Sequence, residues 1–252
     1  MISVALAASA AAVAWRFRWL TLDGAVAASV AGAVILEFGG LRWASALLAF
    51  FASGTVLTMI GRRRKMQPEH VGRGRSAEQV IGTGGVAAVI SLAWGTGLVP
   101  DPAHALLPAA FLGALAASAA DTWATELGML SLQPPRLITN WAYVPAGTSG
   151  GITTVGCLAG IGGAVLISAV GSTGSGPGFT AAWIAGVMAM FIDSLLGATV
   201  QALFRRPDGT VTESPGNGAV PIRGVAWVTN PVVNLLATLT GALVAAALAY
   251  RW

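Results

Sequence analysis

The sequence W-I-A-G-V-M-A-M-F-I-D-S-L-L-G-A-T-V-Q-A-L-F occupies residues 183–204 and contains a single charged residue, Asp193. A helix that crosses the hydrocarbon core of a bilayer needs roughly 20 predominantly apolar residues, and this stretch is long enough. Comparable apolar windows recur along the chain, at 1–15, 24–38, 43–60, 80–99, 103–121, 152–170, 179–203 and 227–249. The sequence therefore predicts an all-α polytopic membrane protein with about eight (seven to nine) transmembrane helices.

The overall composition supports this interpretation. Of the 252 residues, 55% are hydrophobic and 10% are charged, and the mean hydropathy is +0.74. A soluble core of this length could not bury so much apolar surface. Because the connectors are short, residues 1–252 are predicted to form a single membrane-embedded domain. Cys157 is the only cysteine, which excludes an internal disulfide, and it is expected to serve packing.

The basic residues predict how the helices are oriented. If the spans alternate from an amino terminus outside the cell, only Arg42 and Arg251 of the fourteen Lys and Arg residues fall on the outer side. The positive-inside rule then assigns the opposite, basic side to the cytoplasm. The sequence thus predicts a multi-pass protein of the cell membrane. Its net charge of +4 is explained by topology and by contact with anionic membrane lipids, and does not indicate nucleic-acid binding.

Two carboxylates lie at the inner end of the fifth apolar window, in A-A-S-A-A-D-T-W-A-T-E-L-G (116–128). A carboxylate at membrane depth costs on the order of 3 kcal/mol, so Asp121 and Glu126 require compensating partners. Residues four apart share a helix face, which pairs Asp121 with Thr125 and Thr122 with Glu126. Both acids are expected to face one polar cleft, although a simple capping cluster at a helix end is an alternative.

Asp193 interrupts an otherwise apolar span. Asp193, Gly197 and Gln201 are spaced i, i+4, i+8 and form one narrow polar stripe, with Ser194 next to the acid. Such a stripe is expected to face protein or water rather than lipid. The alternative is a buried Asp that neighbouring helices satisfy without any chemistry.

Glycine-rich turns supply candidate phosphate sites. The string P-A-G-T-S-G-G (145–151) opens the sixth window from the basic side, and its amides could point at one anion. It lacks the Gly-Lys-Ser/Thr ending of a P-loop. The string V-I-G-T-G-G-V (80–86) is either a second cradle or a close helix crossing. The candidate residues in these two strings are Gly84, Gly85, Gly147, Thr148, Ser149, Gly150 and Gly151.

Further polar residues lie near these turns. Arg75 and Gln79 share a helical face, Lys65 is expected near the membrane surface, and arginine suits bidentate phosphate contacts. Asn230 and Asn234 enter the last window four residues apart, either for binding or for hydrogen bonds between helices. His70 and His104 fall on opposite sides, so the sequence offers no histidine cluster for zinc and no Ser-His-Asp triad.

Carboxylates, basic residues and glycine-rich turns on one membrane face suit Mg²⁺-dependent phosphoryl transfer. In this interpretation Asp121, Glu126 and Asp193 are both the catalytic residues and the ligands of Mg²⁺. An apolar substrate could enter from the lipid and present its polar head to a cytosolic nucleoside triphosphate. The active site is therefore expected on the cytoplasmic side.

Several strings in chain order resemble one family, the integral membrane proteins that include plant phytyl-phosphate kinase and the transmembrane protein 19 group (domain of unknown function 92). Those with most polar residues are R-S-A-E-Q-V-I-G-T-G-G-V (75–86), A-D-T-W-A-T-E-L-G-M-L-S (120–131), P-A-G-T-S-G-G (145–151), D-S-L-L-G-A-T-V-Q (193–201) and G-V-A-W-V-T-N-P-V-V-N (224–234). The matching pieces cover nearly the whole chain. This sequence has Gly82-Thr83 where the family pattern has Ala-Asn, which removes an amide side chain.

The resemblance implies a kinase that converts an isoprenoid monophosphate, such as phytyl or geranylgeranyl phosphate, into the diphosphate, with CTP as the expected donor. It implies that Asp121, Glu126 and Asp193 are metal and catalytic carboxylates. It also implies that residues 147–151 form a phosphate-binding turn, with Arg75, Gln79, Asn230 and Asn234 around it.

Two other functions remain open at this level. A transporter or flippase for a lipid phosphate could use the same carboxylates to bind a coupling cation, although its polar path should cross the whole bilayer. A cytidylyltransferase that forms a CDP-lipid would share the residues and differ in its product. ATP or another nucleotide could replace CTP, and a homodimer is also an open alternative.

Overall fold

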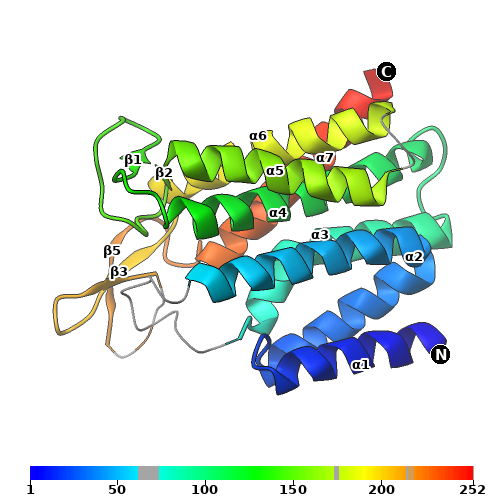
Figure 1. Ribbon diagram of the computed structural model, residues 1–252, viewed down its shortest axis with the longest axis horizontal. Coiled ribbons are helices and arrows are strands. Elements are labelled where there is room, and N and C mark those ends of the chain that lie inside the picture. Colours follow the sequence, from blue (N-terminus) through cyan, green and yellow to red (C-terminus); the bar gives the residue numbers. More distant parts are fainter. Residues whose placement is uncertain (62–73, 173–175, 214–215, 217, 252) are drawn as a thin grey trace.

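The computed structural model describes residues 1–61, 74–172, 176–213, 216 and 218–251. Within these ranges the chain forms seven α-helices, which lie side by side as a bundle (Figure 1). They are α1 (Ile2–Arg16), α2 (Leu22–Gly61), α3 (Ala77–Thr96), α4 (Leu107–Gly128), α5 (Thr154–Gly171), α6 (Pro177–Thr199) and α7 (Asn230–Arg251). All of these except α1, which is shorter, are long and apolar enough to cross a membrane.

Helix α2 is folded back on itself. Its 40 residues would extend about 60 Å as a straight helix, twice the thickness of a bilayer core. At Gly40 the backbone leaves the helical region with φ 73° and ψ −173°, a conformation open mainly to glycine. Both Gly24 and Gly54 contact Arg75, although a straight helix would hold them about 45 Å apart. The two halves of α2 therefore run in opposite directions, as Figure 1 shows.

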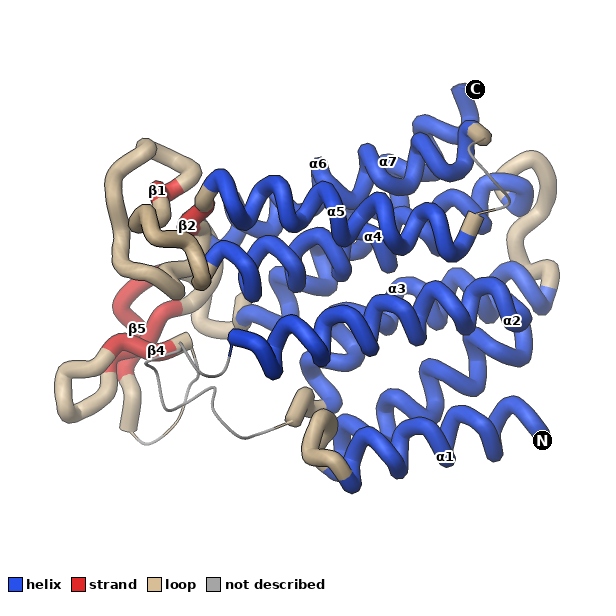
Figure 2. Tube along the Cα trace, in the orientation of Figure 1, coloured by secondary structure: helices blue, strands red, loops and turns tan. Residues whose placement is uncertain are grey.

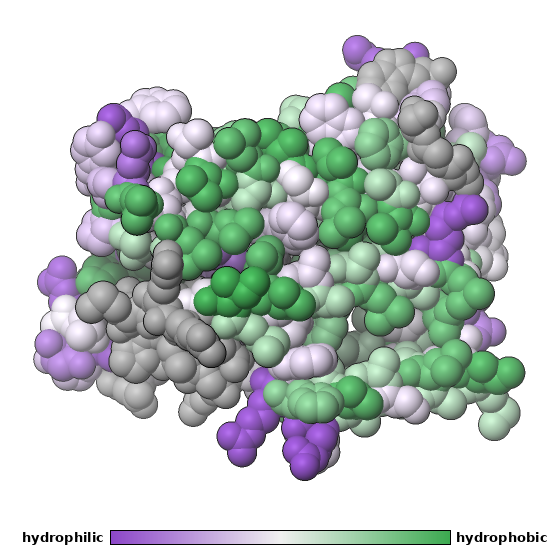
Figure 3. Space-filling model, viewed as in Figure 1, coloured by the Kyte–Doolittle hydropathy of each residue, from purple (hydrophilic) through white to green (hydrophobic). Residues whose placement is uncertain are grey.

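This arrangement confirms the all-α polytopic fold with about eight spans. The two halves of α2 correspond to the predicted windows 24–38 and 43–60, and every other helix falls on one predicted window. The apolar side chains cover the middle of the bundle on the face that Figure 3 shows, and hydrophilic residues gather towards the ends of the helices. This distribution is what a lipid environment requires.

Helix α4 forms the centre of the bundle and packs against α2, α3, α5, α6 and α7. Its residues from Ala109 to Ala120 are all buried, and eight of these twelve are alanine or glycine. Small residues allow helix backbones to approach closely in a membrane. At the crossing with α7, a Cβ on Gly113 would lie 2.3 Å from the carbonyl oxygen of Gly241. The small side chains of α4 thus allow five helices to surround it.

Two small antiparallel sheets, which the sequence did not predict, lie together at one end of the bundle (Figure 2). One pairs β1 (Arg136–Leu137) with β2 (Gly151–Ile152), and the other has the order β4 (Val211–Thr212), β3 (Leu203–Arg205), β5 (Val220–Arg223). The predicted window 179–203 is therefore too long, because α6 ends at Thr199. At the opposite end, the 3-10 helix η2 (His104–Leu106) precedes α4. We call the end with the sheets the basic end, because Arg136, Arg205 and Arg223 lie on their strands.

Candidate functional site

The centre of the candidate site is a pair of carboxyl groups on adjacent helices. Asp121 near the end of α4 and Asp193 on α6 are hydrogen-bonded through their side chains, and Glu213 lies close enough to add negative charge to both. The Ser149 hydroxyl donates to Glu213 Oε1 at 2.6 Å. Two ionised carboxylates this close repel each other unless a proton or a cation lies between them. The pair therefore shares a proton, which a bound cation could replace.

A small cavity opens beside this pair. Its volume is about 10 Å³, which is enough for one water-sized group. Its polar lining comes from four helices and consists of Thr83, Ser118, Asp121, Asp193, Asn234 and Thr238. In the described part of the chain, Asp193 Oδ2 and Asn234 Oδ1 are buried without a hydrogen-bond partner. Both are carboxyl or amide oxygens that can accept a hydrogen bond or bind a cation, and no donor in the described part of the chain reaches them.

These residues fit a hard divalent cation. Mg²⁺ prefers oxygen ligands, and Asp121, Asp193 and Asn234 supply only oxygen to a cation in the cavity. The hydroxyls of the neighbouring helices are already engaged: Ser118 donates to the Thr83 carbonyl at 2.7 Å, and Thr238 to the Leu235 carbonyl at 2.9 Å. The two oxygens that lack partners are therefore the ones available as ligands.

Glu126 does not join the two aspartates. Its Oε1 accepts a hydrogen bond from the Thr58 hydroxyl at 2.7 Å, and it attracts Arg75. Within the described ranges, no three His, Cys, Asp or Glu side chains are grouped so that they could hold a metal ion. The expectation that Asp121 and Glu126 face one polar cleft is therefore wrong. Residues five apart on a helix point about 140° away from each other, which sends Glu126 towards α2 and Asp121 towards α6 and α7.

Arg75 forms the centre of this second cluster. Its backbone pairs with residues 19–21, because its N–H donates to the Trp19 carbonyl at 2.9 Å and its carbonyl accepts from the Thr21 N–H at 3.1 Å. Its guanidinium lies 5.4 Å and 5.5 Å from the ring centres of Phe50 and Phe51. Burial lowers the pKa of Arg75 from its ordinary value, and attraction to Glu126 opposes this change. The guanidinium still remains charged.

A cluster of hydrogen-bond donors lies one turn beyond Asp193. Arg223 on β5 donates through Nη2 to the carbonyl of Gly197 at 2.6 Å. Its Nε and the Nε2 of Gln201 are buried without an acceptor in the described part of the chain. The predicted polar stripe consists of Asp193, Gly197 and Gln201. Near Asp193, buried acceptors lack donors, and near Gln201, buried donors lack acceptors, within the described part of the chain.

The glycine-rich turn 145–151 lies against this stripe. Gly150, with φ 82°, packs so tightly that a Cβ would lie 2.7 Å from the carbonyl oxygen of Ser194. Thr148 closes the turn by donating its hydroxyl to the Pro145 carbonyl at 2.7 Å. The backbone N–H groups of Gly147, Ser149 and Gly150 make none of the hydrogen bonds found among the described residues. As far as the described residues go, these amides are available to an anion next to Gln201 and Arg223.

Other predicted residues lie elsewhere or serve structural roles. Gly84 and Gly85 are inside α3, where the helix uses their amides, so 80–86 is a helix crossing and not a second phosphate cradle. At this crossing a Cβ on Gly82 would lie 2.6 Å from the Pro231 carbonyl oxygen. Gln79 caps α3 by accepting from the Ser76 N–H at 3.0 Å.

Thr122, Thr125 and Asn230 do not line the cavity beside the aspartate pair. Thr122 faces Gly54 of α2, on the same side as Glu126, and Thr125 is exposed. Asn230 is the first residue of α7. Lys65 lies outside the described residues.

Sequence reasoning missed several residues of the site. Thr83, Ser118 and Thr238 line the cavity, but hydroxyls are ordinary in membrane helices and usually bond to their own helix. Arg223 was counted only as a topology signal. Glu213 follows a strand that no periodic pattern predicted, and its acidity in a basic connector was the only available signal.

Comparison with known proteins agrees with a membrane protein. A family model described as "Integral membrane protein DUF92" matches residues 5–242. The uncharacterized membrane protein MJ0933 of Methanocaldococcus jannaschii is 31% identical over 240 residues, which cover 91% of this chain and 85% of the relative. Protein PGR of Arabidopsis thaliana is 29% identical, with 89% and 87% covered. The uncharacterized membrane protein sll0875 of Synechocystis sp. is 30% identical, with 90% and 82% covered. No solved structure matches.

Proposed function

The chain belongs to the integral membrane family DUF92, and from this premise we propose that it is a membrane prenyl-phosphate kinase. It would transfer a phosphoryl group from a nucleoside triphosphate, with CTP as the expected donor, to an isoprenoid monophosphate. The resemblance in sequence suggests the substrate class. The chemistry of the site supports a reaction between phosphates.

One observation carries the proposal. Of the five buried side-chain atoms that lack a hydrogen-bond partner in the described ranges, four lie at the basic end. Two are acceptors, Asp193 Oδ2 and Asn234 Oδ1, and two are donors, Gln201 Nε2 and Arg223 Nε. Leaving such groups unsatisfied costs about 1–3 kcal/mol each. A complex of a cation with phosphates would satisfy both kinds at once.

The residues take distinct roles in this proposal. Asp121, Asp193 and Asn234 would hold Mg²⁺, which when bound neutralises phosphate charge. Gln201, Arg223 and the free amides of the turn 145–151 would bind the phosphates of the donor. An oxygen of the substrate monophosphate attacks the γ-phosphorus, the bond from that phosphorus to the β–γ bridging oxygen breaks, and CDP leaves. The monophosphate is already anionic, so the reaction needs no strong general base.

Arg75 and Glu126 would support the site from the side of α2. Arg75 joins the segment before α3 to α2 and α4 through its backbone pairing and its contacts with Phe50 and Gly54. We assign these two residues a positioning role. We also propose that the basic end, and with it the site, faces the cytoplasm, as the positive-inside rule predicts.

The test is product analysis on the purified protein in lipid nanodiscs. Labelled CTP or ATP, Mg²⁺ and phytyl or geranylgeranyl monophosphate should yield the prenyl diphosphate and a nucleoside diphosphate. Asp193→Asn should abolish product, whereas Glu37→Gln, an exposed acid of α2, should retain it. An Asp193→Asn variant as active as the unmodified protein defeats the metal assignment.

The same assay separates the alternatives. Release of pyrophosphate with formation of a CDP-lipid identifies a cytidylyltransferase. Absence of any product, combined with movement of the lipid phosphate across a vesicle bilayer, identifies a transporter or flippase.

A further inference from the structure

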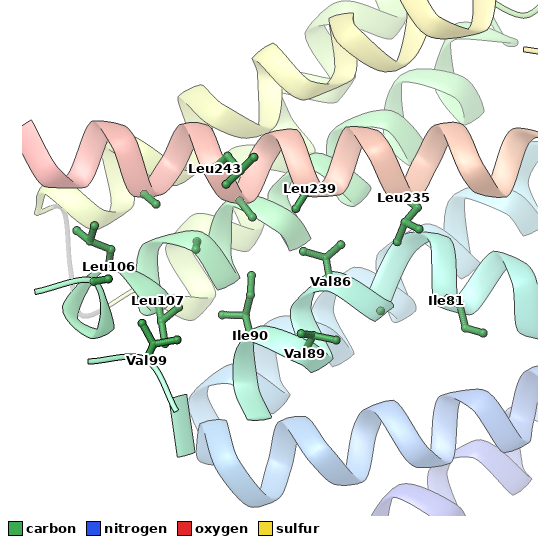
Figure 4. A pocket seen from close by; sticks show the side chains of 15 residues that line it. Ile81, Val86, Val89, Ile90, Val99, Leu106, Leu107, Leu235, Leu239 and Leu243 are labelled. Atoms are coloured by element: carbon green, nitrogen blue, oxygen red, sulfur yellow. The ribbon is translucent and has the colours of Figure 1, made fainter. Parts of the chain in front are cut away.

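An apolar groove lies between α3 and α7. Its volume is about 530 Å³, within the range of a small-ligand site. Val86, Val89 and Ile90 form the wall on α3, and Leu235, Leu239 and Leu243 form the wall on α7. Figure 4 shows these side chains directed into the space between the two helices. We call this space the α3–α7 groove.

The groove runs beside the polar cavity and extends beyond it. Asn234 and Thr238 line the cavity, and their chain neighbours Leu235 and Leu239 line the groove. Helices α3 and α7 meet between the two, where the Thr238 hydroxyl oxygen lies 3.3 Å from the Gly82 carbonyl oxygen. The groove therefore starts at the depth of the cavity and continues along α3 and α7 away from the basic end.

The other end of the groove is closed. Val99 and Leu106, from the connector between α3 and α4, line that end, and Figure 4 places them beyond Ile90 and Leu243. The lining of α7 from Leu235 to Ala246 extends about 17 Å along the helix. This length is close to one leaflet of a hydrocarbon core about 30 Å thick.

We propose that the α3–α7 groove binds the isoprenoid chain of the substrate and limits its length to about one leaflet. This inference rests on the proposed function for the identity of the head group. With the phosphate beside the cavity of Asp121, Asp193 and Asn234, the chain would run along Leu235, Leu239 and Leu243 towards Leu106. The groove contributes hydrophobic contact along the whole chain. Chains longer than the groove must leave it sideways into the lipid, so added units gain no further contact.

The first test compares two tryptophan substitutions at exposed valines. Val89 lies in the groove, whereas Val30 lies on α2 away from it; their exposed fractions are 67% and 61%. Monophosphates of geranyl, farnesyl, geranylgeranyl, phytyl and a long polyprenyl alcohol serve as substrates. For the unmodified protein, kcat/KM should rise with the length of the prenyl chain up to geranylgeranyl or phytyl phosphate. It should not rise further for longer chains. Val89→Trp should lower the geranylgeranyl-to-geranyl ratio of kcat/KM by about tenfold or more, and Val30→Trp should not change it.

A second measurement separates this inference from the proposed function. A geranylgeranyl monophosphate with a diazirine near the end of its chain is photolysed on the protein, and the labelled peptides are identified. If residues 86–90 or 239–246 are labelled but no product forms, the α3–α7 groove binds the chain and the kinase assignment fails. Turnover with label confined to other helices, or an equal loss of the ratio in Val30→Trp and Val89→Trp, overturns the groove.

Discussion

Asp193 on α6 and Asn234 on α7 line the same small cavity, and each has a buried side-chain oxygen that no donor in the described part of the chain reaches. The two residues belong to different helices, so only the packing of α6 and α7 against α4 brings them together. Asp121 of α4 completes the set. Buried oxygens without partners destabilise the folded protein unless a ligand binds to them.

Metal dependence should separate the aspartates from Glu126. In the kinase assay, Asp121→Asn should raise the Mg²⁺ concentration for half-maximal activity by at least about tenfold, because a charged ligand is lost. Glu126→Gln should leave that concentration within about twofold, because Glu126 bonds to Thr58 and attracts Arg75. Its melting temperature should fall, since Arg75 loses an anionic neighbour. Equal shifts in both Mg²⁺ titrations would mean that Glu126 is a ligand after all.

Arg223 should control nucleotide affinity. Arg223→Lys keeps the positive charge but removes the Nε donor, so we expect the KM for CTP to rise about tenfold while the KM for the prenyl phosphate changes little. Arg205→Lys on the adjacent strand β3, where the side chain is exposed, is the matched control and should match the unmodified protein. Steady-state kinetics with each substrate varied in turn measures both constants. A rise confined to the prenyl-phosphate KM contradicts the assignment of Arg223 to the donor.

The crossing of α3 and α7 should be sensitive to one methyl group. In Gly82→Ala the new Cβ meets the Pro231 carbonyl, so overpacking should destabilise the protein by about 1–3 kcal/mol. Gly84→Ala makes the same change two residues further on, where no atom outside the backbone of α3 lies within 4 Å of the new Cβ. It should be neutral or stabilising by up to about 1 kcal/mol. Thermal unfolding in detergent compares the two variants, and equal losses would argue against this crossing.

Orientation can be tested with single cysteines in a Cys157→Ala background. Asp208 is exposed between β3 and β4 at the basic end, and Asp101 is exposed in the connector at the opposite end. A membrane-impermeant maleimide should label Asp101→Cys in intact cells. It should label Asp208→Cys only after permeabilisation. The reverse pattern would place the candidate site outside the cytoplasm.

The spans were predictable because lipid imposes a simple requirement on every helix. Apolar length alone located α3, α5 and α7, and separated the two halves of α2 at the Gly39-Gly40 pair, where the chain turns. The residues at which the helices end were less predictable. The strands β3 and β5 follow α6 at the membrane surface, where apolar length no longer distinguishes a helix from a strand.

The candidate site was predictable only where burial of a charge is costly. Asp121 and Asp193 stood out because lipid penalises carboxylates. That Asp121 faces α6 and α7 whereas Glu126 faces α2 could not be predicted, because it depends on which helices lie on each side of α4. Ser118 gave no signal, because its bond to the Thr83 carbonyl joins two helices and depends on the crossing itself. Arg223 was hidden among basic residues whose number is explained by topology.

The polar stripe of α6 also has a thermodynamic consequence. Since its acceptors at Asp193 and its donors at Gln201 are about two helical turns apart, a cation at Asp193 and an anion at Gln201 would attract each other. Each would then raise the affinity for the other by the same factor, as linkage requires. Isothermal titration of nucleotide with and without Mg²⁺ would give that coupling free energy directly. The pair would behave as one ligand whose net negative charge is smaller than that of the free nucleotide.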